Sequence, residues 1–292
     1  MKPSTLLPLL SLLSASASAH PPPSRRSPPS QYKLSHAPIP SIPGPTFHRP
    51  GSKSALASSS SSPESQKAGA RLSGTNITSV STTFRIPLAE MATTGPTADN
   101  ENGVYQASYW VGIDGVTSAS CGGVSLRAGV DTFWDTGMRS TGAWYEWYPS
   151  QESSQFGNFT LVQGDVVRIT AVADGDGLGG EVRVERVDGL GCEAKVLASA
   201  SHRFEGVASG DRLCLGEAAW VIEDYPLLNQ PEFPLALANF TEVVFQGVEV
   251  NGQGAKGMEV FDINLEAQGG RLTDCEVGDG GSVDCKRVVG DA

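Results

Sequence analysis

Four short motifs bring tryptophan and carboxylate side chains together in the sequence. They read YWVGIDG at 109–115, AGVD at 128–131, AWYEWYP at 143–149 and AAWVIEDY at 218–225, and they contain four of the five tryptophans. On β-strands, aromatic and acidic residues at alternating positions line one face, where they can form a groove for a peptide or a sugar. The candidate groove residues are Trp110, Asp114, Asp131, Glu146 and Trp147.

The same motifs also allow a purely structural interpretation. Tryptophan is on average a highly buried residue, and we expect Trp220 in particular to lie in the core. Asp114 and Asp131 would, in this interpretation, hold loops through hydrogen bonds. We give this role of the two aspartates at least equal weight.

Other kinds of catalytic chemistry find little support in the residue content. His20, His36 and His48 lie near the N-terminus, which leaves His202 as the single histidine of the remaining chain. A serine or cysteine nucleophile with a histidine base is therefore poorly supported. One histidine and bridged cysteines do not form a zinc site, and glycine loops of the phosphate-binding type are missing. We expect neither a metal nor a cofactor.

The elements that position these residues read as β-strands. In EVRVERV at 181–187 valines alternate with charged residues, and DVVRITAVAD, TEVVFQGVEVNG and MEVFDINLEA are runs of comparable length. Clusters of Gly and Asp such as DGDGLGG at 174–180 separate the runs as turns. Many strands closed by turns predict an all-β, antiparallel two-sheet β-sandwich.

The motifs resemble those of the eqolisin family, the glutamic endopeptidases that fungi secrete. The resemblance rests on WVGIDG at 110–115, Cys121, GVD at 129–131, AWYEWYP at 143–149, GD at 164–165 and WVIEDY at 220–225. A weaker match, GARLSGTNITSVSTTFRIP at 69–87, extends it to about residues 66–290. The resemblance implies a sandwich of the concanavalin A-like (lectin–glucanase) type with a groove on its concave face.

Both positions that match the family's catalytic dyad carry other residues. In the family, a glutamate acts as general base on a water, and a glutamine amide donates to the oxyanion that forms. The glutamine position falls on Arg127 and the glutamate position on Ala219. Glu217 shares the strand face of Ala219 but lies about 6–7 Å further along the strand, so it is a displaced substitute at best. We expect Arg127 to pair with Glu217 or a neighbouring acid, because an unpaired buried guanidinium is costly.

Three functions follow from these residues. The preferred one is an eqolisin-family protein that has lost most or all endopeptidase activity and keeps a peptide-binding groove. The alternative is an active acid endopeptidase that uses Glu217 with Arg127. A carbohydrate-binding or glycan-cleaving sandwich, with Glu146 and Asp131 as its two carboxylates, is a distant third.

The N-terminal region differs sharply from the rest of the chain. Residues 1–19 combine Lys2, the apolar run 6–13 and the small residues ASA at 17–19, which is typical of a signal peptide. Residues 20–66 are rich in proline and serine and read as a disordered propeptide or linker, followed by a domain over 67–292. Beyond residue 72 there are 13 basic and 31 acidic side chains, a net charge of −18, whereas residues 1–72 carry eight basic groups and one acid. We expect a secreted monomer whose partners are its own basic propeptide and a polypeptide, with neither nucleic acid nor a membrane.

Secretion also fits the cysteines and the glycosylation motifs. Cys275 and Cys285 flank a short predicted hairpin and are expected to pair, and Cys121 with Cys214 is the second expected bridge, which leaves Cys192. Acceptor sequons begin at Asn76, Asn158 and Asn239.

Overall fold

The computed structural model describes most of the chain beyond residue 65. The described residues are 66–91, 104–117, 120–135, 137–191, 193–224, 226–227, 230–234, 236–265 and 270–288. The predicted signal peptide and, apart from Gln66, the predicted propeptide therefore lie outside the described residues, as does Cys192. Within the described part, no helix is long and apolar enough to span a membrane.

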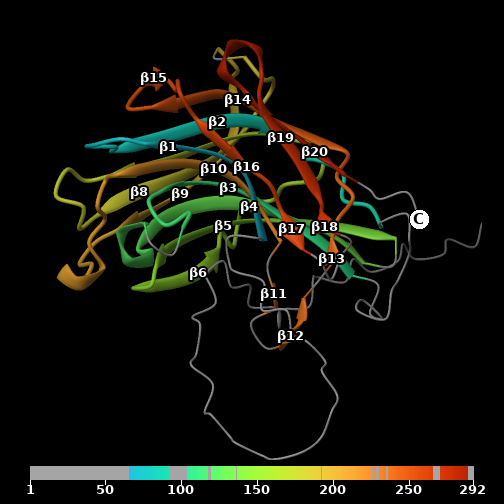
Figure 1. The fold of residues 1–292 in the computed structure, drawn as a ribbon, viewed down its shortest axis with the longest axis horizontal. Helices are drawn as coiled ribbons and strands as arrows, with labels where there is room; N and C mark the ends of the chain where they lie inside the picture. Colours follow the sequence, from blue (N-terminus) through green and yellow to red (C-terminus); the bar gives the residue numbers. More distant parts are fainter. Residues whose placement is uncertain are drawn as a thin grey trace, which may run out of the picture. The chain divides into compact units, whose positions relative to one another are not determined.

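The described chain forms two sheets of eight strands each, so the predicted all-β sandwich is confirmed (Figure 1). Sheet 1 has seven strands in the order β16 (Glu259–Phe261), β1 (Lys67–Ser73), β10 (Glu217–Glu223), β3 (Val104–Ile113), β4 (Ser125–Asp135), β5 (Met138–Tyr148) and β6 (Gln151–Gln155). The eighth strand, β13 (Ala236–Leu237), pairs with β3 in parallel, and the other pairs are antiparallel.

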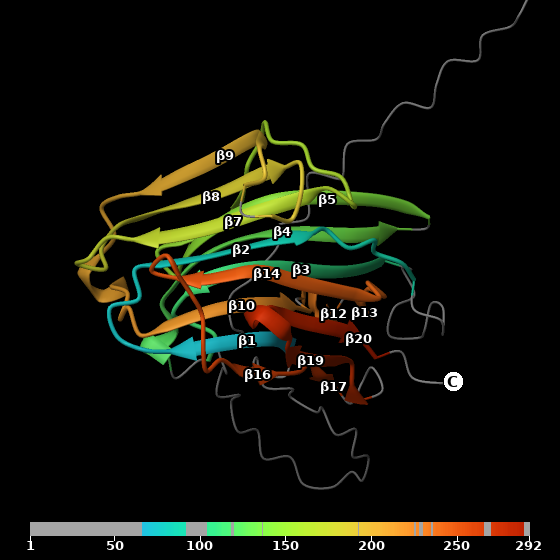
Figure 2. The same cartoon turned by 90° about the horizontal axis from the view of Figure 1, so that it is seen from above.

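Sheet 2 packs against sheet 1 and is antiparallel throughout. Its order is β19 (Thr273–Val277), β20 (Val283–Arg287), β14 (Glu242–Val250), β2 (Ser79–Arg85), β7 (Val166–Ala173), β8 (Gly180–Val187) and β9 (Val196–Phe204), and β15 (Gln253–Gly254) pairs with β14. In Figure 2 the ribbons of β9, β8, β7, β2 and β14 follow one another in this order. Two small hairpins, β11 (Pro226–Leu227) with β12 (Gln230–Pro234) and β17 (Asn264–Leu265) with β18 (Gly270–Arg271), and three 3-10 turns, η3 (Ser120–Gly123), η4 (Ser209–Asp211) and η6 (Asp279–Gly281), complete the described elements.

Side-chain alternation builds the core between the sheets. On β8, Val182 and Val184 are fully buried, while Arg183 between them is exposed. Sheet 1 contributes Leu126, Ala218 and Trp220 to the same core, together with other residues of its inner face. The strands β3, β4 and β10 differ from β8, because nearly all their residues are buried on both faces. Sheet 1 therefore has an outer face that is also largely shielded from solvent.

Both predicted disulfides are present. Cys275 and Cys285 are paired across the hairpin of β19 and β20, as the sequence predicted. Cys121 is bonded to Cys214 and so joins η3 to the segment that leads into β10. Of the three sequon asparagines, Asn76 and Asn158 are exposed and Asn239 is half-buried.

Candidate functional site

Strand pairing places five residues in one row across sheet 1. Arg71 on β1 is paired with Ala219 on β10, which is paired with Gly112 on β3. Gly112 is in turn paired with Arg127 on β4, and Arg127 with Glu146 on β5. Directly paired residues of antiparallel strands project from the same face. The row therefore brings the two positions matched to the eqolisin dyad, 127 and 219, onto the outer face with one glycine between them.

Arg127 forms an ion pair inside this face. Its side chain is fully buried, and Nη2 donates to Glu146 Oε2 at 2.5 Å. Its Nη1 lies 3.9 Å from Glu223 Oε2, and the guanidinium carbon lies 5.2 Å from the centre of the Trp110 ring. The guanidinium thus contacts two carboxylates and an aromatic face, which suits its planar, delocalised charge. The expected pairing with a neighbouring acid is found, and the acid is Glu146.

Trp110 joins this ion pair to a second cation. Its Nε1–H donates to Glu223 Oε2 at 2.8 Å, and Lys67 Nζ lies 5.8 Å from the centre of its ring. Lys67 is itself buried and donates to the carbonyl oxygen of Val116 at 3.0 Å. We call Lys67, Trp110, Arg127, Glu146 and Glu223 the charged cluster. The cluster contains two positive and two negative side chains. Their mutual attraction offsets part of the free-energy cost of removing four charges from water.

Burial controls the electrostatics of the charged cluster. Loss of solvent raises the pKa of Glu146 above its ordinary value. Arg127 opposes this shift by attraction, and Glu223 adds to it by repulsion. The guanidinium held against Glu146 Oε2 favours the ionised form of this carboxyl and so limits the effect of its burial.

Two glycines make room for the large side chains of this face. A Cβ added at Gly129 would lie 2.7 Å from Trp110 Cβ, from Trp144 Cζ2 and from the carbonyl oxygen of Tyr109. A Cβ at Gly112 would lie 3.0 Å from Arg127 Cγ. Glycine at these two positions therefore allows the tryptophans and Arg127 to lie close over the strands.

Ala219, the residue that the sequence resemblance assigns to the general-base position, carries a methyl group. Ala219 is fully buried and packs in a small apolar cluster with Trp110, Val116, Trp144 and Val221. Two residues along the strand, Glu217 Oε1 accepts a hydrogen bond from the Val116 amide at 3.1 Å. Burial raises the pKa of Glu217, while this hydrogen bond and the charge of Arg71 oppose the shift. The displaced carboxylate thus supports the loop that follows β3.

The two aspartates of the groove prediction differ in what they contact. Asp114 accepts hydrogen bonds from the backbone amides of Leu215, Gly216 and Glu217 at 2.9–3.1 Å, which matches the loop-holding alternative. Burial raises the pKa of Asp114, and these amides oppose the shift. Asp131 is fully buried on β4, where it is paired with Ser108 and Gly142 and shares the outer face with Arg127.

Trp147 does not lie with the other groove candidates. It is the neighbour of Glu146 on β5, so it projects from the opposite face into the core between the sheets. There it packs 5.6 Å from the Phe204 ring, and its Nε1–H donates to the carbonyl oxygen of Asp211. The prediction of Trp147 as a groove residue is wrong for this geometric reason. Trp220 lies in the same core, as expected.

His202 also takes part in packing between the sheets. Its ring stacks on Tyr145 with centroids 4.1 Å apart. Burial lowers the pKa of His202. Among the described residues, no group of three or more His, Cys, Asp or Glu side chains is arranged to hold a metal ion.

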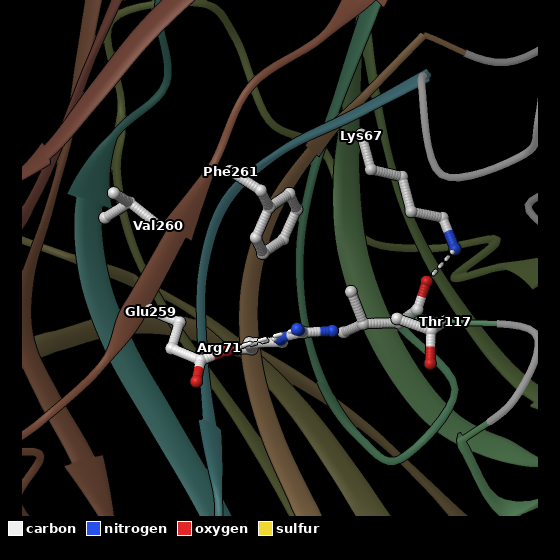
Figure 3. Close-up of a pocket in the computed structure, with 7 residues that line it drawn as sticks. Lys67, Arg71, Thr117, Glu259, Val260 and Phe261 are labelled. Atoms are coloured by element: carbon white, nitrogen blue, oxygen red, sulfur yellow. Dashed lines mark hydrogen bonds and ion pairs between the residues drawn. The ribbon is translucent and has the colours of Figure 1, made fainter.

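A cavity of about 190 Å³ lies at the β1 end of the outer face (Figure 3). Its lining comes from β1, from the loop after β3 and from β16, and consists of Lys67, Arg71, Val116, Thr117, Glu259, Val260 and Phe261. In Figure 3, Arg71 extends toward Glu259, and a dashed line marks the hydrogen bond of the Lys67 amine, whose acceptor is the carbonyl oxygen of Val116. The sequence prediction missed Lys67 and Arg71. The available signal was their alternation in KAGARLS, which places both cations on one face of a strand.

Comparisons with known proteins agree with this fold and site. Residues 65–287 match the model of the Peptidase A4 family. The chain is 30% identical to aspergillopepsin-2 of Aspergillus niger over 222 residues, which cover 72% of this chain and 73% of the relative. It is 29% identical to scytalidopepsin B of Scytalidium lignicola over 234 residues, covering 77% of this chain and 78% of the relative.

Solved structures give the same result. The crystal structure of scytalido-glutamic peptidase with a transition state analog inhibitor superposes with a TM-score of 0.59 at 26% identity, covering 76% of this chain and 98% of the other. The structure of aspergilloglutamic peptidase from Aspergillus niger gives a TM-score of 0.52 at 31% identity and covers 63% of this chain and 99% of the other.

Proposed function

Because the chain belongs to the peptidase A4 family, the glutamic peptidases called eqolisins, we propose that it is a secreted relative that binds polypeptide without the family's proteolysis. The binding surface is the outer face of sheet 1. The reaction is lost because the general base and the oxyanion donor are both replaced. The ligand on this face is a polypeptide in an extended conformation, and the chain acts as a monomer.

One observation carries this proposal: Arg127 forms a buried ion pair with Glu146, and position 219, on the other side of Gly112 in the same row, carries only a methyl group. General-base catalysis needs an ionised carboxylate within hydrogen-bond reach of the attacking water. Ala219 has no group that accepts a proton. Arg127 is held by Glu146 at 2.5 Å and lies 3.9 Å from Glu223, so its charge is already engaged. Loss of one oxyanion donor alone typically costs about 3–4 kcal/mol of transition-state stabilisation.

Polypeptide as the ligand is supported by the solved relatives. Their structures include scytalido-glutamic peptidase with a peptide based transition state analog. The outer face of this chain keeps aromatic and carboxylate side chains in Trp110, Trp144, Glu146 and Asp131, which are buried and form its floor, and the accessible part of the face is the cavity at its β1 end. Such a face suits the backbone and side chains of an extended peptide.

The test is cleavage of a denatured protein between about pH 2 and 5, where carboxylates titrate. The unmodified protein is compared with Arg127→Gln, with Ala219→Glu and with the double variant. We expect activity only in the double variant. The new carboxylate would be paired with Arg71 in the row, which favours its ionised form. A double variant that folds but stays inactive would argue against a scaffold that lacks only its dyad.

Activity in the unmodified protein would contradict the proposal. If Glu217→Gln then abolished that activity, a displaced general base would be at work. The matched control is Glu181→Gln, which changes a carboxylate on the outer side of sheet 2. A loss caused by Glu217→Gln and not by Glu181→Gln would assign the activity to the outer face of sheet 1.

Secretion is supported by the two disulfides, which form and persist in oxidising compartments. We expect the mature protein in the culture medium of its host, without residues 1–19 and with the basic segment 20–66 either bound to the acidic domain or removed. N-terminal sequencing of the secreted protein tests this. A mature chain that begins at Met1 would contradict it.

A further inference from the structure

The cavity at the β1 end is the accessible end of the five-residue row. The Arg127 side chain is fully buried, whereas the Arg71 side chain keeps 32% of its surface exposed. Phe261 on the cavity wall also packs against the apolar cluster that contains Trp110 and Ala219. The cavity and the outer face of sheet 1 are therefore contiguous. A polypeptide bound along this face can therefore insert a side chain or its C-terminus into the cavity.

Two cations give the cavity its chemical character. Arg71 donates through Nε and Nη2 to a single oxygen, Glu259 Oε2, at 3.1 Å in both cases. The Glu259 side chain is 68% exposed, and an ion pair this exposed contributes little to stability. A second carboxylate can therefore share or replace Glu259 on the guanidinium, which is shaped to bind carboxylates with two parallel hydrogen bonds.

Lys67 adds a second positive charge from the inner side of the cavity. Its ammonium group is almost fully buried and bonded to the Val116 carbonyl. Electrostatic attraction is stronger near a buried charge than near an exposed one, because water screens it less. Against Lys67 and Arg71 the lining offers one carboxylate, Glu259. Behind this lining, Glu223 of the charged cluster lies across the strands from Lys67, and Glu217 attracts Arg71. The cation that a ligand carboxylate meets is therefore the partly exposed guanidinium of Arg71, whose lining partner is Glu259.

The volume of the cavity and the side chains on its walls further restrict which ligand group can bind there. The volume of about 190 Å³ exceeds the roughly 30 Å³ that one water occupies in the liquid, so the cavity has room for a carboxylate and its methylene groups. Val116, Val260 and Phe261 supply apolar contacts for such methylenes, and Thr117 adds a hydroxyl. Ala219, opposite Arg71, cannot neutralise the guanidinium, whereas a glutamate there would.

We propose that this cavity binds a carboxylate of the polypeptide that lies on the outer face of sheet 1. The inference rests on the proposed function and specifies its ligand as an acidic peptide. The carboxylate belongs to a glutamate or aspartate side chain or to the peptide's C-terminus, since both present the same group to Arg71 and Lys67.

The experiment measures binding of fluorescein-labelled heptapeptides to the full chain at pH 7 by fluorescence anisotropy. The peptides consist of Ala, Phe and Leu and differ at one central position, Glu or Gln, each with a free or an amidated C-terminus. We expect peptides with the recognised carboxylate to bind about tenfold more tightly than the uncharged ones. An effect of the central residue assigns a side-chain carboxylate, and an effect of amidation assigns the C-terminus.

Three variants connect the effect to the cavity. Arg71→Gln should abolish the advantage of the carboxylate peptides, and Glu259→Gln should enlarge it by removing a competing carboxylate. Arg183→Gln, which changes an exposed, ion-paired arginine of sheet 2, should leave it unchanged. The opposite signs of the first two variants keep the test decisive if Arg71→Gln fails to fold.

The two proposals fail in different ways. Equal binding of charged and uncharged peptides, or an advantage that survives Arg71→Gln, would overturn this inference and leave the peptide-binding face intact. Absence of binding by every peptide would overturn the proposed function and this inference with it.

Discussion

The outer faces of the two sheets carry the same kinds of residue in different surroundings. On sheet 2, Arg183 pairs with Glu181 at 2.8 Å, and their side chains are 50% and 35% exposed. On sheet 1, Arg127 pairs with Glu146 at 2.5 Å, and their side chains are 0% and 3% exposed. The first pair is an ordinary surface feature of an alternating strand. In the pair on sheet 1, both charged groups are buried and therefore not solvated by water.

The buried pair of sheet 1 has an energetic cost that the exposed pair of sheet 2 does not have. A buried ion pair contributes little net stability, because desolvation offsets the attraction, but removing one partner leaves an uncompensated charge. In the charged cluster, Arg127 serves Glu146 and Glu223 together, so these residues depend on one another. Coupled buried charges of this kind are more typical of functional sites than of the exposed protein surface.

Arg127→Met should produce the largest effect. The variant keeps similar volume but leaves Glu146 and Glu223 without the guanidinium, and we expect the free energy of unfolding to fall by about 3–5 kcal/mol at pH 7. Without Arg127 the already raised pKa of Glu146 rises further, so the folded state gains a proton more readily than the unfolded state. The loss should therefore shrink as pH falls toward about 4. Urea denaturation at both pH values measures this, and an equal loss at the two values would contradict it.

Gly129→Ala tests the tight packing of the same face. The added methyl would overlap Trp110, Trp144 and the Tyr109 carbonyl at 2.7 Å. We expect a destabilisation of about 1–3 kcal/mol from this overpacking. Gly157→Ala is the matched control, because a Cβ there meets no atom within 4 Å. Equal thermal midpoints for the two variants would refute the close approach.

Glu217→Gln isolates one buried carboxyl. The side chain can still accept from Val116, but it no longer titrates. Because the pKa of Glu217 is raised in the folded state, the native protein binds its proton first and gains stability as pH falls from the raised value to about 4.3. The variant should lack this part of the gain. Denaturation curves between pH 7 and 4 measure it, and identical slopes for both proteins would contradict the expectation.

Arg183→Gln should have the smallest effect. Its ion pair with Glu181 lies in solvent, where such pairs contribute about 0–1 kcal/mol. Salt should reduce even this contribution, whereas the loss caused by Arg127→Met should respond less because the buried pair is screened less. Denaturation at low and high ionic strength compares the two variants. A larger loss for Arg183→Gln would reverse the contrast between the two faces.

Much of the fold could be predicted from local sequence. Alternation in EVRVERV appears directly as β8, whose valines are buried and whose Arg183 is exposed. The pairing of Cys275 with Cys285 followed from their position on a short hairpin. These features depend on residues close together in the chain, and period-two alternation reports the burial of a strand face without any knowledge of its partners.

The site could be predicted only in part. The motifs identified Trp110, Asp131 and Glu146, which share the outer face of sheet 1. They also suggested Trp147, which projects from the opposite face of the same sheet into the core. Two roles were predicted for Asp114, in the groove or in holding a loop, and its carboxylate holds the backbone before β10. Lys67 and Arg71 lie far from these motifs in sequence and gave no aromatic or acidic signal.

The fold class, the family resemblance and the Cys275–Cys285 bridge could be read from the sequence, and the resemblance assigned Arg127 and Ala219 to the dyad positions. Which groups surround those two residues depended on the tertiary structure. Register between strands that are distant in the chain places Arg71 beside Ala219 and Glu146 beside Arg127. The physical reason is that alternation specifies the face of each residue along a strand, whereas the neighbours across the sheet depend on packing of the whole sandwich.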